Sequence, residues 1–321
     1  MRRACTLFAV LILSLGSIQA SAAEKGRIRW ITSVYVDAKG VGLKYPEGVA
    51  CNDDLFVVAD TGNSRLIRYA YADDSVTPEP VLRAGKTSPI KVQMTSGGDL
   101  YFLDGRDRQI MRMSADGKEL QQLEPTGVPS KGDIVPKSFA IDAKDSIYVL
   151  DIFSRHVIVL AADGTYDRRV PFPEEHGFIT DLTVDANGKI ILVDSVEAVV
   201  YTAAKGEKQF SRLTESLKEF MNFPARLAVD DDGVIYLVDQ HGSGLALIGQ
   251  DGEFMGRQLG MGWNDRSLYY PAQVCISQSG YVFIADRNNS RVQIYRVGKA
   301  KAAKAADEEA AGQDAAGEPS E

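Results

Sequence analysis

Short runs of apolar residues that end in aspartate recur along the chain at a nearly constant interval. The runs read VVAD, YFLD, YVLD, ILVD, YLVD and FIAD. Their aspartates are Asp60, Asp104, Asp151, Asp194, Asp239 and Asp286, at successive intervals of 44, 47, 43, 45 and 47 residues. A proline lies 14 or 15 residues before five of them, and Ile179 takes this place in the fourth. Such repetition indicates one structural unit used six times.

Each repeat carries the pattern of several short strands. Val, Ile, Leu, Tyr and Phe dominate the apolar runs, and Gly, Asn and Asp lie between them, which favours strands joined by tight turns. In the fifth repeat the expected strands are 227–229, 234–238, 245–248 and 254–259. A four-stranded unit of 43–47 residues is typical of a β-propeller blade. Only Leu213–Met221 has a helical period, which suggests a single helix within a connection.

The two ends of the repeat array complement each other. After Asp286 the chain has one further strand pattern, Val292–Val297, so the sixth unit lacks its outermost strand. Ile28–Val36 precedes the first unit and has the length and pattern of that missing strand. We therefore predict an all-β, six-bladed propeller in which the N-terminal segment supplies the outer strand of the last blade and leaves no open edge.

Two of the repeats resemble a known family. PEGVACNDDLFVVADTGNSRLIRY (46–69) and PAQVCISQSGYVFIADRNNSRVQIYRV (271–297) are similar to NHL repeats. The similarity covers essentially all of 25–297 and is strong in the first and sixth repeats and weak in the fourth. The resemblance implies a six-bladed propeller. It implies no single function, because NHL propellers include both interaction modules and a few enzymes.

The segments outside the repeats differ from them in composition. Residues 1–23 combine Arg2 and Arg3, an apolar run over Leu7–Leu15, and Ala20-Ser21-Ala22, which is the pattern of a signal peptide. The run is short for a transmembrane anchor, the lesser alternative, and no lipobox cysteine follows it. We expect a periplasmic or secreted protein whose propeller spans 24–298. The Ala- and Glu-rich residues 299–321 are expected to form a disordered tail.

Charge narrows the range of partners. The net charge is −8, or −10 without Arg2 and Arg3, and the sequence shows no run of basic residues. Nucleic acids and anionic membranes are therefore unexpected partners.

The repeated aspartates are expected to serve the fold. Each follows a strand and opens a turn, where its carboxylate can accept backbone N–H groups. In four repeats an arginine follows four or five residues later, close enough for an ion pair within the blade. These arginines are Arg65, Arg108, Arg155 and Arg291.

A second set of repeated positions is expected to line the mouth of the central channel. Thirteen residues before the aspartates lie Glu47, Lys91, Ser138, Asp181, Arg226 and Gln273. Adjacent opposite charges suggest the inter-blade pairs Glu47–Lys91 and Asp181–Arg226, because buried charges are normally paired. Ligand contacts by the same ring are the alternative.

Enzymatic relatives of the family suggest tests for catalysis. Propeller lyases that amidate peptides hold zinc through several histidines, but His156, His176 and His241 occupy unrelated positions. Lactonase-type propellers hold calcium through Glu, Asn and Asp, and Glu47 and Asp181 alone would be available. We predict no catalytic residue, metal or cofactor, and an enzyme of the lactonase or amidating-lyase kind is the alternative to a binding module.

Cys51 and Cys275 fall on the inner strands of the first and sixth blades, which are adjacent in a closed ring. They lie nine and eleven residues before the aspartates of their blades, which places them at different heights. Two buried thiols are favoured by this count, and a disulfide remains open because its geometry is strict.

The blade-to-blade connections vary most between repeats, so we expect binding on the face that they form. The connection 260–270 carries Trp263, Arg266 and Tyr269, a composition typical of interface hot spots. Tyr270 could instead pack under the loop, as Tyr45 and Phe223 would at matching positions. We predict a monomeric scaffold that binds a protein or peptide, or a glycan, with a purely structural envelope component as a further alternative.

Overall fold

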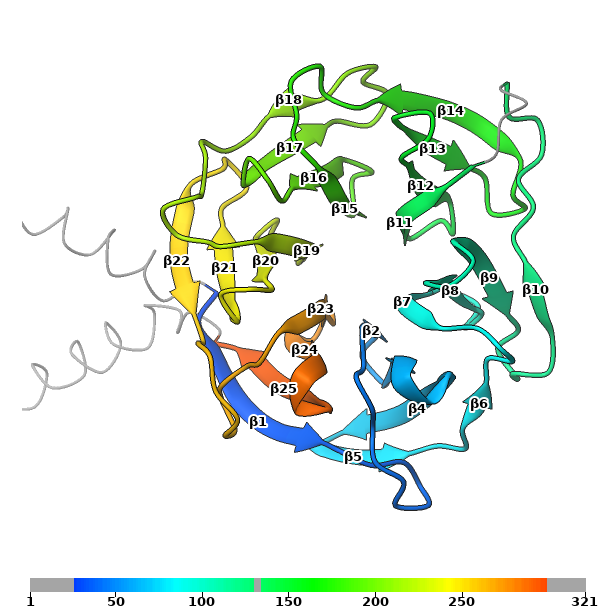
Figure 1. Ribbon diagram of the computed structural model, residues 1–321, viewed down its shortest axis with the longest axis vertical. Helices are drawn as coiled ribbons and strands as arrows, with labels where there is room; N and C mark the ends of the chain where they lie inside the picture. The colour runs from blue at the N-terminus through cyan, green and yellow to red at the C-terminus, as the bar shows by residue number, and fades with distance from the viewer. Residues whose placement is uncertain (1–25, 130–133, 299–321) are drawn as a thin grey trace, which may run out of the picture. The chain divides into compact units, whose positions relative to one another are not determined.

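The computed structural model describes residues 26–129 and 134–298, and nearly all of its regular structure is β-strand. Six antiparallel sheets follow one another round a central axis in chain order (Figure 1). The predicted signal peptide and tail lie outside the described residues. In the described part of the chain, no helix is long and apolar enough to cross a membrane.

The strands of the six blades have the following bounds. Blade one contains β2 (Gly48–Cys51), β3 (Leu55–Asp60), β4 (Arg65–Ala72), β5 (Ser75–Pro78) and β6 (Leu82–Arg83), and blade two contains β7 (Pro89–Met94), β8 (Leu100–Asp104), β9 (Gln109–Met113) and β10 (Leu120–Gln122). Blade three contains β11 (Pro136–Ile141), β12 (Ile147–Asp151), β13 (His156–Leu160) and β14 (Tyr166–Pro171), and blade four contains β15 (Ile179–Val184), β16 (Ile190–Asp194), β17 (Val199–Ala203) and β18 (Ser211–Arg212). Blade five contains β19 (Pro224–Val229), β20 (Ile235–Asp239), β21 (Gly244–Ile248) and β22 (Phe254–Gln258), and blade six contains β23 (Pro271–Ile276), β24 (Tyr281–Asp286), β25 (Arg291–Val297) and β1 (Ile28–Val34).

The first strand of each blade lies nearest the axis, and the last strand lies at the rim (Figure 1). Second strands such as β8 and β12 are buried along their whole length, because both of their faces pack against neighbouring blades. The apolar clusters accordingly lie between blades: Val57 and Leu66 of blade one pack with Val92 and Phe102 of blade two. Burial of these faces is the main stabilising term of the ring.

The predicted closure is confirmed. Strand β1 pairs antiparallel with β25, from Ile28 opposite Val297 to Val34 opposite Val292, with a bulge between Trp30 and Thr32. Blade six is thus built from both ends of the propeller, as the order β1-β25-β24-β23 shows. The connection from β1 to β2 then crosses the front of the ring in the view of Figure 1.

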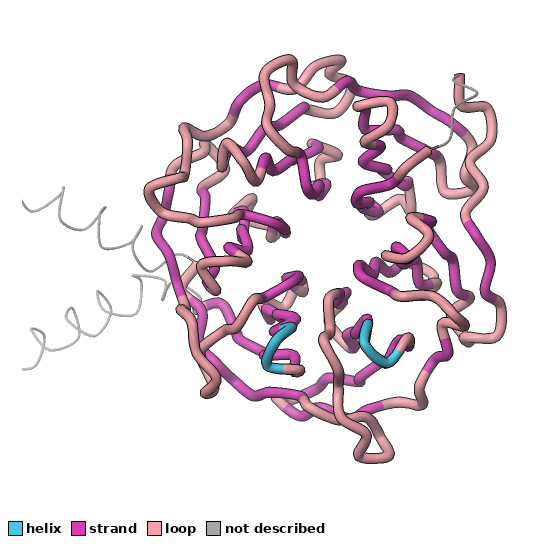
Figure 2. The backbone as a smooth tube through the Cα atoms, in the orientation of Figure 1, coloured by secondary structure: helices cyan, strands magenta, loops and turns pink. Residues whose placement is uncertain are grey.

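The helix suggested for Leu213–Met221 does not form. The segment is a loop with a single turn, in which Met221 N–H donates to Leu217 O, while Leu217 N–H donates to Ala198 O of blade four. Leu217 and Met221 are buried between blades four and five, so their helical spacing reflects docking of the loop. The described helical turns are η1 (Thr61–Asn63) and η2 (Arg287–Asn289), on neighbouring blades (Figure 2).

The six repeated aspartates tie each connection to its blade. Each accepts the backbone N–H of a residue 16 or 17 positions earlier, at 2.7–3.0 Å. The donors are Lys44, Ser88, Val135, Phe178, Phe223 and Tyr269. A carboxylate that accepts such bonds orders the chain as it enters the first strand of each blade.

The expected Asp–Arg pairs form in two repeats of four. Arg65 and Arg291 contact Asp60 and Asp286 at 2.6 and 2.7 Å. Both arginines lie five residues after the aspartate, at the start of a strand. Arg108 lies four residues after its aspartate, in a turn with a left-handed φ of 56°, and no ion pair of Arg108 occurs within 26–129 and 134–298. The offset of one residue directs its side chain elsewhere.

Cys51 and Cys275 form a disulfide between blades one and six, with an S–S distance of 2.08 Å and a Cα–Cα distance of 6.0 Å. The preference for two thiols was therefore wrong. Cys51 lies opposite Phe56 and Cys275 opposite Phe283, which are four and three residues before their aspartates. The difference of two in sequence shrinks to one in register, because the turn after Cys51 is shorter than the turn after Cys275.

We expect Cys51→Ser/Cys275→Ser to lower the free energy of unfolding by about 2–4 kcal/mol. The crosslink joins residues 224 apart, and closing a long loop reduces the entropy of the unfolded chain. Urea denaturation with and without a reductant measures the effect. The reductant should destabilise the unmodified protein by the same amount and leave the double variant unchanged; equal stability of all samples would contradict the prediction.

Candidate functional site

The first strands bring the predicted ring together at the channel mouth. Lys91 Nζ lies 2.6 Å from Asp181 Oδ1 and donates to Ser138 Oγ at 2.8 Å. Lys91 and Asp181 are 2% and 1% exposed, and Ser138 is buried. These residues come from blades two, three and four, so the lysine reaches past the short serine to the carboxylate beyond it. Such burial indicates a structural ion pair.

Asp181 has little capacity left for other cations. Besides Lys91, it accepts hydrogen bonds from Ser138 Oγ and from the backbone N–H of Leu227 at 3.0 Å. Arg226 approaches it only at 4.0 Å and donates instead to the backbone O of Thr180 at 3.1 Å. The predicted Asp181–Arg226 pair is present as a secondary contact.

The prediction of a Glu47–Lys91 ion pair is wrong, because Glu47 pairs with Arg287. Glu47 Oε1 lies 2.9 Å from Arg287 Nε in η2, and the Arg287 guanidinium also lies over the rings of Tyr45 and Tyr270. Gln273 Oε1 accepts the backbone N–H of Val49 at 3.3 Å and so links blades six and one. Both negative members of the ring are therefore held by cations of the protein.

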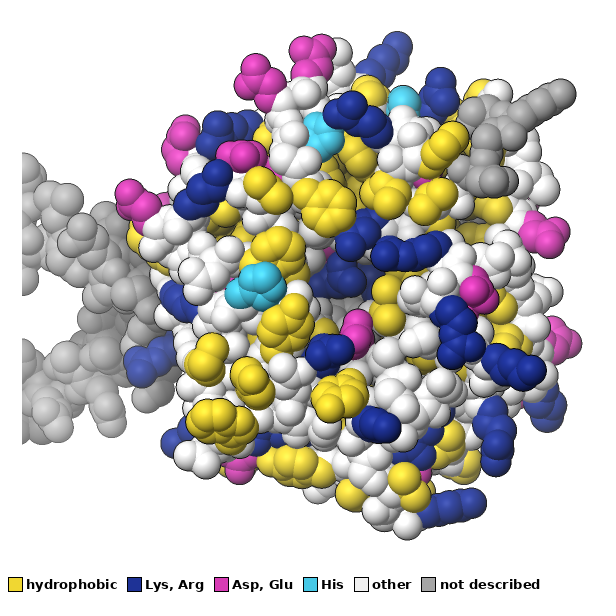
Figure 3. Space-filling model, viewed as in Figure 1, with side chains coloured by type: hydrophobic (Ala, Val, Ile, Leu, Met, Phe, Trp, Pro, Cys, Tyr) yellow, Lys and Arg dark blue, Asp and Glu magenta, His cyan; other side chains and the backbone are white. Residues whose placement is uncertain are grey.

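Lys137 is a member of the mouth that the repeat analysis missed. It lies at the bulge between Pro136 and Ser138 in β11, and its Nζ lies 5.0 Å from the centre of the Phe178 ring. Burial, together with the charges of Arg226 and Arg108, lowers the pKa of Lys137 to about 8. Figure 3 shows Lys and Arg side chains gathered round the hollow at the centre of this face. The absence of a basic run in the sequence therefore does not exclude a basic cluster in space.

The predicted contact residues of the loop 260–270 differ in their exposure and in the side chains that they contact. Trp263 is 73% exposed and makes an edge contact with Tyr269, whose ring centroid lies 6.0 Å away. Arg266 lies over the ring of Trp30 at 5.6 Å. Tyr270 is half-buried and stacks on His241 of blade five, with ring centroids 5.5 Å apart.

This loop is fixed from below. Arg291 donates to the backbone O of Asn264 at 2.7 Å and of Ser267 at 2.8 Å. Gln293 accepts the backbone N–H of Arg266 at 3.0 Å, and Leu268 is buried. An exposed tryptophan thus lies on a loop whose backbone is held by buried side chains.

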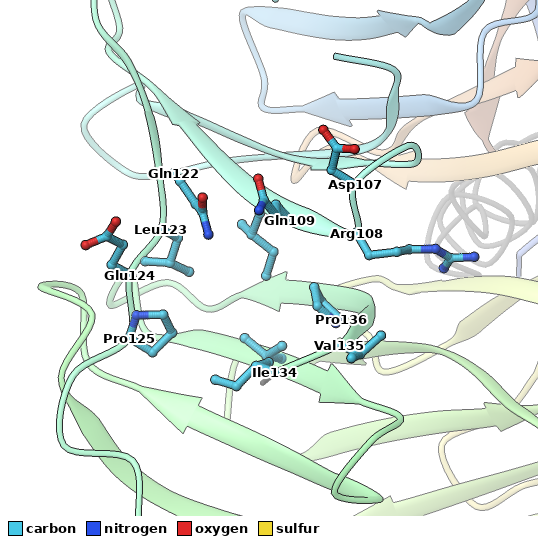
Figure 4. A pocket seen from close by; sticks show the side chains of 12 residues that line it. Asp107, Arg108, Gln109, Gln122, Leu123, Glu124, Pro125, Ile134, Val135 and Pro136 are labelled. Carbon is cyan, nitrogen blue, oxygen red and sulfur yellow. The ribbon is translucent and has the colours of Figure 1, made fainter. Parts of the chain in front are cut away.

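Cavities are also found among the described residues. One of about 530 Å³ lies between blades two and three, lined by residues such as Gln109, Leu123, Ile134 and Pro136. Figure 4 shows the Arg108 side chain extending away from the other lining residues. The second, of about 580 Å³, includes His176 with three glutamates.

Metal ligands are not gathered in the part of the chain that the structure describes. Within 26–129 and 134–298, no three His, Cys, Asp or Glu side chains lie together in a way that could hold an ion. His156, His176 and His241 instead contact Ser154 O, Pro173 O and the rings of Phe223 and Tyr270.

Comparison with known proteins supports the architecture. The profile of the NHL repeat matches residues 268–295, and no curated protein sequence matches the chain. Virginiamycin B lyase from Staphylococcus aureus superposes with a TM-score of 0.58 at 12% identity, over 85% of this chain and 100% of that chain. A gluconolactonase from Xanthomonas campestris gives 0.61 at 16% identity, over 87% and 92% of the two chains. A chain of a nidogen/laminin complex gives 0.54 at 18% identity, over 67% and 80%. The chain is a six-bladed β-propeller that contains an NHL repeat.

Proposed function

We propose that this protein is an exported binding module that holds a protein, peptide or glycan on its connection face. The observation that carries the proposal is Trp263, which is 73% exposed on a loop anchored by Arg291 and Gln293. Large aromatic side chains in fixed positions contribute most of the free energy at many interfaces. A loop that is already ordered also loses little entropy when a partner binds.

The alternative is an enzyme of the lactonase or amidating-lyase kind. It draws on the fold shared with a lyase and a gluconolactonase, and at identities of 12% and 16% that likeness concerns the fold alone. Elemental analysis of the purified protein and melting temperatures with and without a chelator separate the two functions. A shift of several degrees that calcium or zinc reverses would favour the enzyme.

Trp263→Ala should weaken partner capture by about 30-fold, the effect of a hot spot of about 2 kcal/mol. The melting temperature should change little, because the side chain contacts only Tyr269 among the described aromatic rings. Quantitative pull-down from envelope extracts with the immobilised protein measures capture.

Phe153→Ala is the matched control, since Phe153 is also exposed, at 66%, and follows Asp151 in a turn of the same face. It should retain capture. Undiminished capture by Trp263→Ala, with loss on replacing Asp116 or Asp163 in the opposite turns, would place the binding surface on the other face.

A further inference from the structure

Three cationic side chains of the channel mouth have no carboxylate of their own. Arg108 comes from the turn after β8, Lys137 from the bulge of β11 and Arg226 from β19, so that blades two, three and five each contribute one. In the described ranges, Arg108 and Lys137 take part in no ion pair or side-chain hydrogen bond, and Arg226 reaches Asp181 only at 4.0 Å. Their positive charge is therefore not balanced locally.

The carboxylates at the mouth are already engaged. Asp181 is held by Lys91 at 2.6 Å, and Glu47 by Arg287 at 2.9 Å. Each of these pairs is neutral, so the charges of Arg108, Lys137 and Arg226 remain in excess. The net charge of the whole chain is −8, so this positive cluster is opposite in sign to the chain as a whole.

Aromatic side chains lie beside two cations of this face, Lys137 of the cluster and Arg287. Phe178 is 42% exposed and lies under Lys137, and Tyr45 is 45% exposed and lies under Arg287. Phe178, Phe223 and Tyr270 each immediately precede the first strand of a blade, and Tyr45 lies three residues before β2. Figure 3 shows hydrophobic side chains alternating with Lys and Arg round the central hollow. Such a border offers apolar surface to a ligand whose charged group lies among the cations.

We propose that the channel mouth binds an organic oxyanion, a carboxylate- or phosphate-bearing molecule, through Lys137 and Arg226 with Arg108 at the rim. The guanidinium offers a planar pair of donors to two oxygens, and the ammonium completes the charge balance. The ring system or chain attached to the oxyanion lies against the Phe178 side of the mouth. This inference rests on the proposed function, because it names a chemical group that the connection face would recognise.

Isothermal titration with citrate and with inorganic phosphate at low ionic strength tests the proposal. Lys137→Met and Arg226→Met should each weaken binding by about tenfold or more, since a charge-assisted hydrogen bond is lost. Lys39→Met is the matched control, because Lys39 is an exposed lysine of the connection between β1 and β2. It should bind both probes as the unmodified protein does. Preference for citrate or for phosphate distinguishes the two sources of the oxyanion.

The pH dependence adds a second measurement. The pKa of Lys137 is about 8, so affinity should fall as pH rises from 7 to 9 and this ammonium loses its proton. The other charged groups that face it are Arg226, Arg108 and Asp181. Burial also lowers the pKa of Lys91. Lys137→Arg should retain binding at pH 9, whereas a decline that persists in this variant would assign the titration to Lys91.

The outcomes separate this proposal from the proposed function. Absence of saturable binding of both probes, or equal losses in Lys137→Met and Lys39→Met, would overturn the oxyanion site. Partner capture that depends on Trp263 would stand in that case. Conversely, Trp263→Ala should bind citrate and phosphate normally. If Trp263→Ala also captured the partner normally, the proposed function would fail and the oxyanion site would stand.

Discussion

Deletion of residues 24–36 is expected to abolish the cooperative unfolding of the monomeric propeller. The deletion removes β1, whose register with β25 extends from Ile28–Val297 to Val34–Val292. Strand β25 would then present unpaired N–H and C=O groups at an open edge, which favours association with other chains. Size-exclusion chromatography and thermal melts monitored by circular dichroism measure the result.

The effect should be large because β1 belongs to two apolar clusters. Ile28 and Trp30 pack with Val282 and Tyr295, whereas Ile31 and Val34 pack with Val292 and its neighbours. Fully burying one large apolar side chain contributes about 1.5–3 kcal/mol, and three of these four are partly buried. Their loss is therefore comparable with the whole stability of a typical domain, about 5–15 kcal/mol, and the exposed edge adds to it.

A synthetic peptide of residues 24–36 should restore the monomer when added to the truncated protein. Strand addition to an exposed sheet edge is a known mode of peptide binding. Deletion of 300–321 is the control and should leave the melting temperature unchanged, because that composition cannot bury much apolar surface. A truncated protein lacking 24–36 that stays monomeric with an unaltered melting temperature would disprove closure by β1.

The fold could be predicted because its determinants repeat. Six copies of an apolar run ending in aspartate fixed the number of blades, and the missing strand after Val297 indicated closure by the N-terminal segment. Features that do not repeat were harder to predict from the sequence. The Cys51–Cys275 disulfide was missed because a count along the chain includes turns of unequal length, whereas height in a sheet depends on register.

The site could be predicted only in part. Counting back from the aspartates identified the residues at the mouth but not their partners, since Lys91 passes the small Ser138 to reach Asp181. Lys137 was missed because the bulge between Pro136 and Ser138 interrupts the alternation of side chains. A bulge redirects a side chain, and the pattern of apolar and polar positions does not predict where a bulge occurs. The bulges recur in β7, β11, β15, β19 and β23, and only β11 has a charged residue there.

Asp181→Asn should destabilise the propeller by about 3–5 kcal/mol at pH 7, because it leaves the buried ammonium of Lys91 without a counter-charge. Asparagine has one amide oxygen, so it can accept either from Leu227 N–H or from Lys91 and Ser138, and the variant removes one acceptor together with the charge. Lys91→Met combined with Asp181→Asn should recover most of the loss, since both charges are then absent. Urea denaturation of the single and double variants gives the coupling free energy.

The deficit of Asp181→Asn should shrink as pH rises. Burial lowers the pKa of Lys91 even with Asp181 beside it, and without that carboxylate the pKa falls further. A lysine whose pKa is lower in the folded state binds its proton less tightly there than in the unfolded chain. The folded state therefore loses stability at low pH and regains it as pH rises from the folded pKa toward the unfolded value of about 10.4. Unfolding measured at pH 7 and at pH 9.5 should show the recovery in the single variant and none in the double variant. Asp116→Asn, which breaks the exposed pair with Lys118 at 2.8 Å, should have little effect at either pH. If Asp181→Asn were as stable as the unmodified protein at pH 7, the pair at the channel mouth would not hold the blades together.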